Sequence, residues 1–122
     1  MRLALYQPDI PQNTGTIMRL AACFGVTLDI IEPCGFVFSD SKLRRAGMDY
    51  ADRVLVERHA SWEKFLEDRA SGRLVLLTTK STAPITDFTF QADDLLLFGS
   101  ESSGVPDSVY EAVDGRLRIP MR

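Results

Sequence analysis

The sequence predicts an α/β domain in which a mostly parallel sheet is flanked by helices. Two runs of consecutive apolar residues, Leu74–Leu77 and Leu95–Phe98, lack polar alternation and are typical of strands covered on both faces. A strand, a helix and a second strand also follow one another through short loops within residues 2–31, a rhythm that indicates parallel pairing. Because the chain has 122 residues, of which 45% are hydrophobic, we expect a single domain spanning residues 1–122.

The first strand is expected at Arg2–Gln7, followed by a turn-rich loop that contains Pro8 and Pro11. Asn13 is predicted to cap the next helix, because its side chain can accept hydrogen bonds from the first free amides. Gly25 is predicted to end this helix. The apolar residues that recur at helical spacing, and should form its buried face, are Ile17, Leu20, Ala21 and Phe24.

Further strands are expected after this helix, and their predicted ranges are Val26–Ile31, Val54–Val56, Arg73–Thr79, Leu95–Phe98 and Arg116–Met121. A helix from Ser61 to Ala70 should be capped by Ser61 and should bury Trp62, Phe65 and Leu66. Trp62 is interpreted as a core residue rather than a platform for base stacking. Pro106 suits the first turn of a last helix, where its missing N–H leaves no unpaired donor.

Two polar loops follow neighbouring apolar runs, at residues 78–81 and 99–106, and ligands in open α/β folds bind at such carboxyl ends. The two loops could therefore wall one pocket. Gly99 and Gly104 bracket the second loop and permit close approach of a ligand. Glu101 argues against a polyphosphate and favours hydroxyls or a cation. The alternative is an ordinary turn rich in glycine and serine.

The cations outside the predicted core are candidates for contacts with phosphate. Arg19 lies off the apolar face of its helix, and Lys42, Arg44 and Arg45 form the densest positive cluster in the chain. Solvated surface charge is the alternative for both. Because the net charge is −3, a general affinity for polyanions is not favoured, and any role with nucleic acid must rest on local clusters.

The remaining composition bounds the class of protein. No apolar run approaches the length of a membrane span, and the first residues form a predicted strand rather than a signal peptide, so we expect a cytoplasmic protein. Cys23 and Cys34 make neither a metal cluster nor a disulfide framework and are expected to be reduced thiols packed in the fold. His59 has no partner at metal or triad spacing, so we expect no metal site and a structural or exposed histidine.

Three ordered segments together resemble a known family. Asn13–Gly15 with Arg19, then Phe98–Pro106, then Ile119–Met121 resemble the motifs of the SpoU branch of the SPOUT RNA methyltransferases. The segments that look most like the TrmL (YibK-like) tRNA ribose methyltransferases are Ile30–Pro33, Leu43–Tyr50 and Leu77–Lys80. The resemblance runs the whole length of the chain.

The resemblance implies an α/β-knot fold with a C-terminal trefoil knot, a homodimer, and S-adenosylmethionine bound among the loops after the last strands. It places the cofactor at Leu77, Thr78, Gly99, Glu101, Ile119 and Met121. In the family a further segment and a final helix follow Ile119–Met121 and complete the knot, so the resemblance implies that 122 residues leave the knot incomplete.

The family reaction methylates the ribose 2′-hydroxyl of the tRNA wobble nucleotide, a cytidine or uridine. The resemblance makes Arg19, Asn13 and Glu101 the catalytic residues. Because a guanidinium stays protonated far above neutral pH, Arg19 is better suited to hold phosphate and stabilise the developing oxyanion than to act as a base. The expected contacts with the tRNA backbone are Lys42, Arg44, Arg45 and Lys80. The alternatives are a non-catalytic module that binds RNA or a nucleotide, and a ribosomal RNA 2′-O-methyltransferase of the same superfamily.

Overall fold

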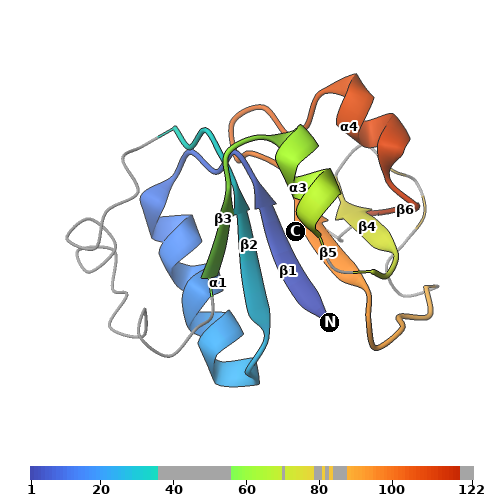
Figure 1. The fold of residues 1–122 in the computed structure, drawn as a ribbon, viewed down its shortest axis with the longest axis horizontal. Coiled ribbons are helices and arrows are strands. Elements are labelled where there is room, and N and C mark those ends of the chain that lie inside the picture. Colours follow the sequence, from blue (N-terminus) through green and yellow to red (C-terminus); the bar gives the residue numbers. More distant parts are fainter. Residues whose placement is uncertain (36–55, 70, 79–80, 82, 84–87, 119–122) are drawn as a thin grey trace.

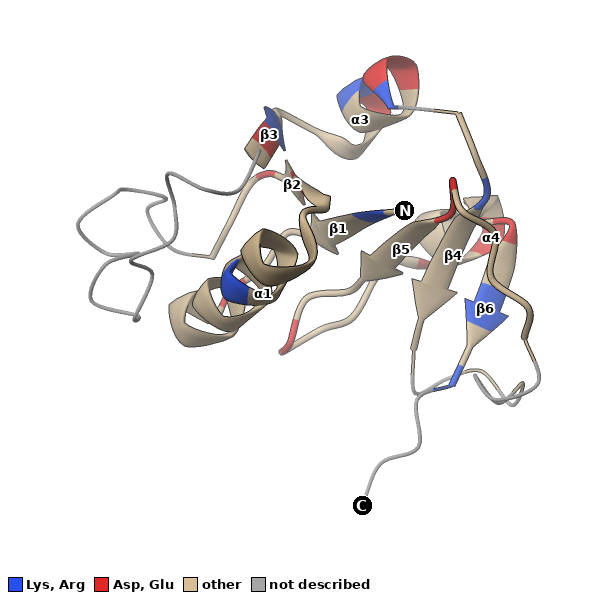
Figure 2. Cartoon of the chain, turned by 90° about the horizontal axis from the view of Figure 1, so that it is seen from below, with Lys and Arg blue, Asp and Glu red and all other residues tan. Residues whose placement is uncertain are grey.

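The computed structural model describes residues 1–35, 56–69, 71–78, 81, 83 and 88–118. They form a six-stranded sheet of order β3-β2-β1-β5-β4-β6. Every adjacent pair in this order is parallel, which confirms the predicted sheet. Figure 2 shows α1 and α3 on opposite sides of the sheet. Among the described residues, no helix combines the length and the apolar character needed to cross a bilayer.

The strands are β1 (Arg2–Tyr6), β2 (Thr27–Ile31), β3 (Val56–His59), β4 (Leu74–Leu77), β5 (Leu95–Phe98) and β6 (Gly115–Leu117). A strand is present at each predicted place, but β3 shares only Val56 with the predicted Val54–Val56 and continues to His59. The strand expected from residue 54 is observed from Val56, and residues 54 and 55 lie outside the described residues. Residues 119–122 also lie outside them, so the trefoil knot stays a prediction.

Helix α1 (Pro11–Phe24) begins two residues before the predicted cap. Asn13 as the N-cap is therefore wrong: Ile10 holds that position, and no side chain caps the helix. Pro11 starts it instead, because the fixed φ of proline suits the first helical position. Gly25 ends the helix as predicted, in the left-handed conformation with φ of 66°.

The buried face of α1 agrees with the predicted one in part: Ala21 is buried and Ile17 packs against the core, as expected, but Leu20 and Phe24 do not. Its buried residues are Thr14, Gly15, Met18 and Ala21. Leu20 and Phe24 were expected in the core, but they are 48% and 76% exposed. Met18 fills the buried face together with the smaller Thr14, Gly15 and Ala21, and Leu20 and Phe24 lie away from it.

Helix α3 (Trp62–Asp68) is capped as predicted, because the Lys64 amide donates to Ser61 Oγ over 3.1 Å. The helix ends before Ala70, with Arg69 as its C-cap. Leu66 was expected to be buried but is 40% exposed. Helix α4 (Asp107–Ala112) follows Pro106, which occupies the N-cap rather than the first turn.

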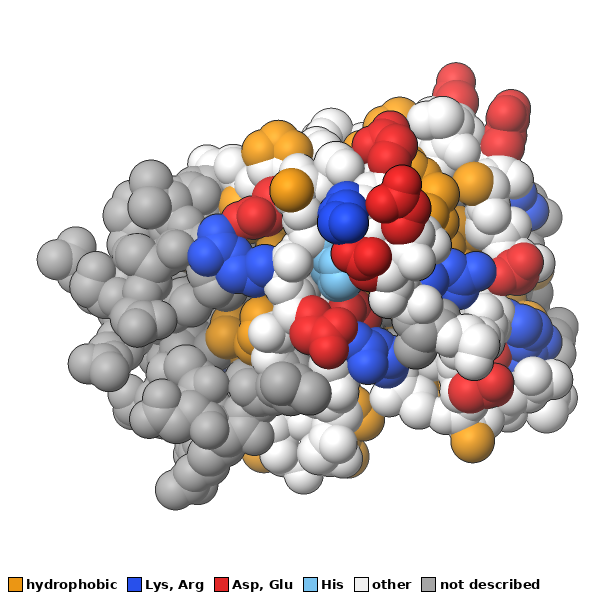
Figure 3. Space-filling model, in the orientation of Figure 1, with side chains coloured by type: hydrophobic (Ala, Val, Ile, Leu, Met, Phe, Trp, Pro, Cys, Tyr) orange, Lys and Arg blue, Asp and Glu red, His pale blue; other side chains and the backbone are white. Residues whose placement is uncertain are grey.

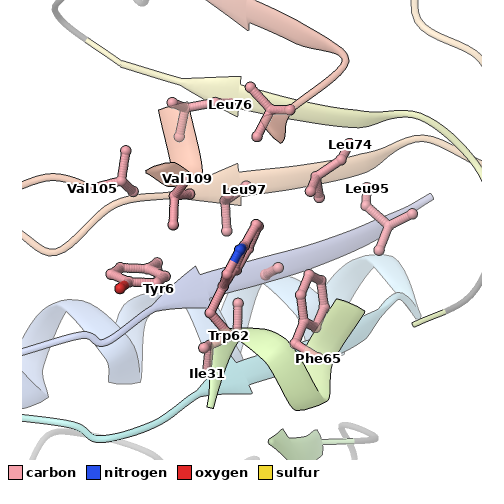
Figure 4. Close-up of a cluster of buried hydrophobic side chains, with 12 residues drawn as sticks. Tyr6, Ile31, Trp62, Phe65, Leu74, Leu76, Leu95, Leu97, Val105 and Val109 are labelled. Atoms are coloured by element: carbon pink, nitrogen blue, oxygen red, sulfur yellow. The ribbon is translucent and has the colours of Figure 1, made fainter. Parts of the chain in front are cut away.

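One face of the sheet carries the larger aromatic core (Figure 4). Trp62 and Phe65 of α3 pack there, as predicted, and Tyr6 meets the Trp62 ring edge-on at 5.9 Å between centroids. Val105 and Val109, from the loop after β5 and from α4, join the same cluster. This packing fixes the carboxyl ends of β1 and β5 side by side, and the loops that leave those ends form the candidate site.

A buried polar cluster lies beside this core, where Figure 3 shows the histidine among acidic and basic side chains. His59 is 5% exposed, and its Nε2 lies 2.9 Å from Asp29 Oδ1. Arg2 donates to both carboxylate oxygens of Asp29 and to Glu57. His59 therefore has the structural role that was one of the two predicted for it.

Candidate active site at the carboxyl edge of the sheet

The loop after β5 closes on itself as a tight turn. The Ser100 amide donates to the Gly104 carbonyl over 2.9 Å, and the Gly104 amide donates back over 2.7 Å. Gly104 has φ of 66°, a conformation that favours glycine. A Cβ on Gly99 would lie 2.8 Å from the Gly104 carbonyl carbon, so only glycine at residue 99 allows this closure.

A cavity of about 400 Å³ opens between this loop and the end of β4. Its lining includes Leu77 and Thr78 from the first predicted loop and Gly99 and Glu101 from the second. The two loops therefore wall one cavity, because β4 and β5 are neighbours in the sheet. Leu77 is 9% exposed and supplies an apolar wall. The amide of Thr78 donates to the Leu117 carbonyl over 2.8 Å, which ties β4 to β6 at this edge.

The donors and charges of this cavity fit S-adenosylmethionine. Apolar side chains from Leu76, Leu77 and Val105 face it, which suits an adenine ring. Among the described residues of the lining, Glu101 is the only charged one. A carboxylate as the charge of the described lining accommodates a positively charged sulfonium better than a polyphosphate.

A second cavity, of about 260 Å³, lies between the start of the same loop and α1. Asn13 and Thr16 of α1 line it together with Pro8 and with Phe98 of β5. Gly99 and Glu101 belong to both cavities. The loop after β5 thus forms part of the lining of both cavities, a shared wall that exposes Glu101 to each of them.

Hydrogen bonds join this shared wall to the loop between β1 and α1. The amide of Glu101 donates to Asp9 Oδ1 over 3.1 Å, and Ser102 Oγ donates to Asp9 Oδ2. In return, the amide of Asp9 donates to Glu101 Oε2 over 3.0 Å. Hydrogen bonding with Glu101, and then with Ser102, lowers the pKa of the Asp9 carboxyl to about 2. Asp9 is therefore ionised throughout the physiological range.

The remaining predicted residues lie elsewhere. Arg19 is exposed on α1 and contributes to neither cavity, and among the described residues it has no hydrogen bond or ion pair. The predicted cofactor residues Ile119 and Met121 lie outside the described residues. So do the predicted RNA contacts, which are Lys42, Arg44, Arg45 and Lys80.

The sequence interpretation missed Asp9. It follows β1, which pairs with β5, so its loop emerges beside the loop that holds Glu101. The usable signal was its place just after a strand of a parallel sheet, where ligand sites gather.

The cysteines also differ from expectation in part: both are free, but Cys23 is exposed and not packed in the fold. Burial, followed by the nearby Glu32 carboxylate, raises the pKa of the Cys34 thiol to about 11.

Protein families and curated relatives that match this sequence identify its family. A family model described as the SpoU rRNA Methylase family matches residues 1–122, so the chain belongs to that family. A tRNA (cytidine(34)-2′-O)-methyltransferase from Beijerinckia indica is 57% identical over 122 residues. The match covers 98% of this chain and 76% of the relative.

Solved structures agree with the family. A structure concerned with 2-OH methylation of C/U34 on tRNA matches with a TM-score of 0.91 at 42% identity, covering 98% of this chain and 79% of the other. The SpoU methyltransferase AviRb from Streptomyces viridochromogenes, in complex with AdoMet, matches with a TM-score of 0.82 at 24% identity. That match covers the full chain and 51% of AviRb, and it supports the fold alone.

Proposed function

We propose that this protein transfers a methyl group from S-adenosylmethionine to the ribose 2′-hydroxyl of nucleotide 34 in tRNA. The observation that carries the proposal is the match over nearly the whole chain to a tRNA (cytidine(34)-2′-O)-methyltransferase at 57% identity. The two cavities support it, because Gly99 and Glu101 line both of them, and methyl transfer needs the cofactor and the acceptor side by side with the acceptor oxygen in line with the methyl group.

The cofactor is assigned to the cavity of about 400 Å³, where Leu77, Thr78 and Gly99 would hold it together with Glu101. Ile119 and Met121, by the family resemblance, would complete this binding site from outside the described residues. When bound, the cofactor supplies a methyl group on a positively charged sulfur. The protein's contribution is then to align the acceptor oxygen with that methyl group and to exclude water.

The acceptor ribose is assigned to the side lined by Asn13 and Glu101. Asn13 is exposed there and can hydrogen-bond a sugar hydroxyl, and the Glu101 carboxylate can accept the hydrogen bond of the 2′-hydroxyl. Arg19 has no partner among the described residues and is free to hold a phosphate beside the acceptor. As a protonated guanidinium it would stabilise negative charge on the 2′-oxygen, a contribution of about 2–4 kcal/mol for a group of this kind.

The tRNA backbone is assigned to the basic residues Lys42, Arg44, Arg45 and Lys80, which lie outside the described residues. Their local positive charge would allow a protein of net charge −3 to bind a polyanion.

A homodimer forms the second part of the proposal. The exposed side chains Leu20 and Phe24 stand four residues apart on α1, and Phe24 is 76% exposed, which is unusual for a large apolar residue in water. A second copy of the chain covering this stripe would bring Arg19, on the same helix, to the interface. We expect Phe24→Ser to shift the protein from dimer to monomer in sedimentation, whereas Leu66→Ser, a matched change at an exposed leucine of α3, should leave the dimer intact.

The reaction is tested with labelled S-adenosylmethionine and tRNA that lacks ribose methylation. After digestion, mass spectrometry should identify a 2′-O-methylated nucleoside from position 34. Label in ribosomal RNA and none in tRNA would instead identify a ribosomal RNA methyltransferase. A protein that binds tRNA but neither transfers label nor binds the cofactor would be a non-catalytic binding module.

A further inference from the structure

Asp9 joins two loops that are far apart in the sequence. Its carboxylate accepts the Glu101 amide and the Ser102 hydroxyl, and its own amide donates to Glu101 Oε2. In Figures 1 and 2 the loop after β5 runs beside the turn between β1 and α1. The backbone amide and the carboxylate of Asp9 therefore both form hydrogen bonds with the loop after β5.

The loop after β2 also packs against Asp9. The Gly35 amide donates to the Pro8 carbonyl over 2.9 Å. A Cβ on Gly35 would lie 2.5 Å from Asp9 Cβ and 2.9 Å from Asp9 Cα, so the backbones are in direct contact. Asp9 thus lies between the loop after β2, which packs against its backbone and Cβ, and the loop after β5, which its carboxylate binds.

We propose that Asp9 is a positioning residue for methyl transfer, which fixes the Glu101 loop, the segment that lines both the cofactor cavity and the acceptor cavity. This inference rests on the proposed function. Asp9 lines neither cavity, so it acts through Glu101 and Ser102 rather than by touching a substrate. The donors to its carboxylate are a backbone amide and a hydroxyl. An ionised carboxylate can accept hydrogen bonds from both at once.

The inference predicts which changes at residue 9 are tolerated. In Asp9→Asn one oxygen acceptor is replaced by an NH₂ donor, so one of the two donors of the loop loses its partner. We expect cofactor affinity to fall about tenfold and kcat to fall by at least a similar factor, because a loosened wall misplaces both reactants. Ser102→Ala removes one of the two hydrogen bonds to the Asp9 carboxylate and should have a smaller effect. The double variant should lose less than the product of the two single effects, since both changes break the same contact.

Gly35→Ala provides a second route to the same disturbance. It alters no atom of Asp9 or of the loop after β5, yet its new methyl group must displace Asp9. We expect it to reproduce the loss of cofactor affinity seen in Asp9→Asn. The matched control is Asp68→Asn, a change at an exposed aspartate of α3 that pairs with Lys64, and it should leave kcat and cofactor affinity unchanged.

The experiment combines isothermal titration with S-adenosylmethionine, steady-state kinetics on tRNA and hydrogen exchange of the Glu101 amide. Asp9→Asn should speed exchange at Glu101 and lower kcat while thermal unfolding stays close to that of the wild type. A purely structural role would lower the unfolding temperature and leave kcat per folded molecule unchanged, and this would overturn the inference. Unchanged exchange at Glu101, or strictly multiplicative effects in the double variant, would also overturn it. A wild-type protein that neither binds the cofactor nor methylates tRNA would instead reject the proposed function, and the exchange measurement separates the two failures.

Discussion

Replacement of Gly99 by alanine tests whether the closed turn after β5 is what holds the cofactor. The new Cβ would lie 2.8 Å from the Gly104 carbonyl carbon and 2.9 Å from its Cα, well inside normal contact. Both neighbours are backbone atoms, so the turn must open. Opening breaks the two hydrogen bonds between Ser100 and Gly104, at 2.9 and 2.7 Å. At about 1 kcal/mol net for each bond, closure loses about 2 kcal/mol.

This loss corresponds to about a 30-fold weaker Kd for S-adenosylmethionine if the cofactor binds the closed turn. The assay is isothermal titration, with circular dichroism to establish that the variant is folded. Gly104→Ala is the graded comparison, because its Cβ would meet nothing within 4 Å and only the φ of 66° is strained. A strain of about 1 kcal/mol predicts a weakening of about fivefold.

Gly25→Ala is the matched control outside the site. Gly25 also has φ of 66° and open space around its Cβ position, but it ends α1. We expect a loss of about 1 kcal/mol in the free energy of unfolding and an unchanged Kd. The reasoning would be refuted if a folded Gly99→Ala protein bound the cofactor within threefold of the wild type, or if Gly104→Ala were the more damaging change.

Three further predictions concern charge. Arg19→Lys keeps the charge but loses the planar fork, so kcat should fall at least tenfold with cofactor Kd unchanged, and wild-type turnover in that variant would contradict the proposed role. Affinity for tRNA should fall as salt rises, and neutralising Arg44 should reduce the slope of log K against log salt by about one; a flat response would remove this residue from the interface. Arg73 donates to both carboxylate oxygens of buried Asp94 and lowers the pKa of that carboxyl. The pair therefore stabilises the fold at pH values above the unfolded pKa of about 4, and this stabilisation is lost as the pH falls through the lower pKa of the folded state. Asp94→Asn should therefore lower the unfolding temperature by several degrees at pH 7 and converge with the wild type in acid.

The fold was largely predictable because uninterrupted apolar runs in the sequence indicate buried strands. Leu74–Leu77 and Leu95–Phe98 are both strands in the sheet; the first is buried throughout, whereas buried and half-buried residues alternate in the second. The orientation of α1 was not predictable in the same way. Leu20 and Phe24 were assigned to the core by their spacing with Ala21, whereas the helix is seated through Thr14, Gly15 and Met18 together with Ala21. The rotation of a helix depends on which side chains let it approach, and Leu20 and Phe24 follow from that rotation.

The candidate site was predictable in part for a topological reason. Two polar loops after adjacent parallel strands must emerge at one edge, and the cavity between Thr78 and Gly99 follows from this rule. The rule does not say which further strand lies beside them. Only the pairing of β1 with β5 brings Asp9 to a loop that is 92 residues away in the sequence. The place of Asp9 just after β1 indicates this edge of the sheet, but its sequence neighbours do not indicate which loop it contacts.

The shared wall has a consequence for how the two substrates affect each other. Gly99 and Glu101 line both cavities, so a ligand that favours the closed turn on one side also orders the surface offered to the other. Thermodynamic linkage then requires the same factor in both directions: if the cofactor tightens binding of the anticodon nucleotide, that nucleotide must tighten binding of the cofactor equally. Asp9 holds the turn before either ligand arrives, so the ordering that each ligand would otherwise have to impose is already present. Loosening this contact should therefore increase the coupling between the two ligands while it weakens the affinity for each.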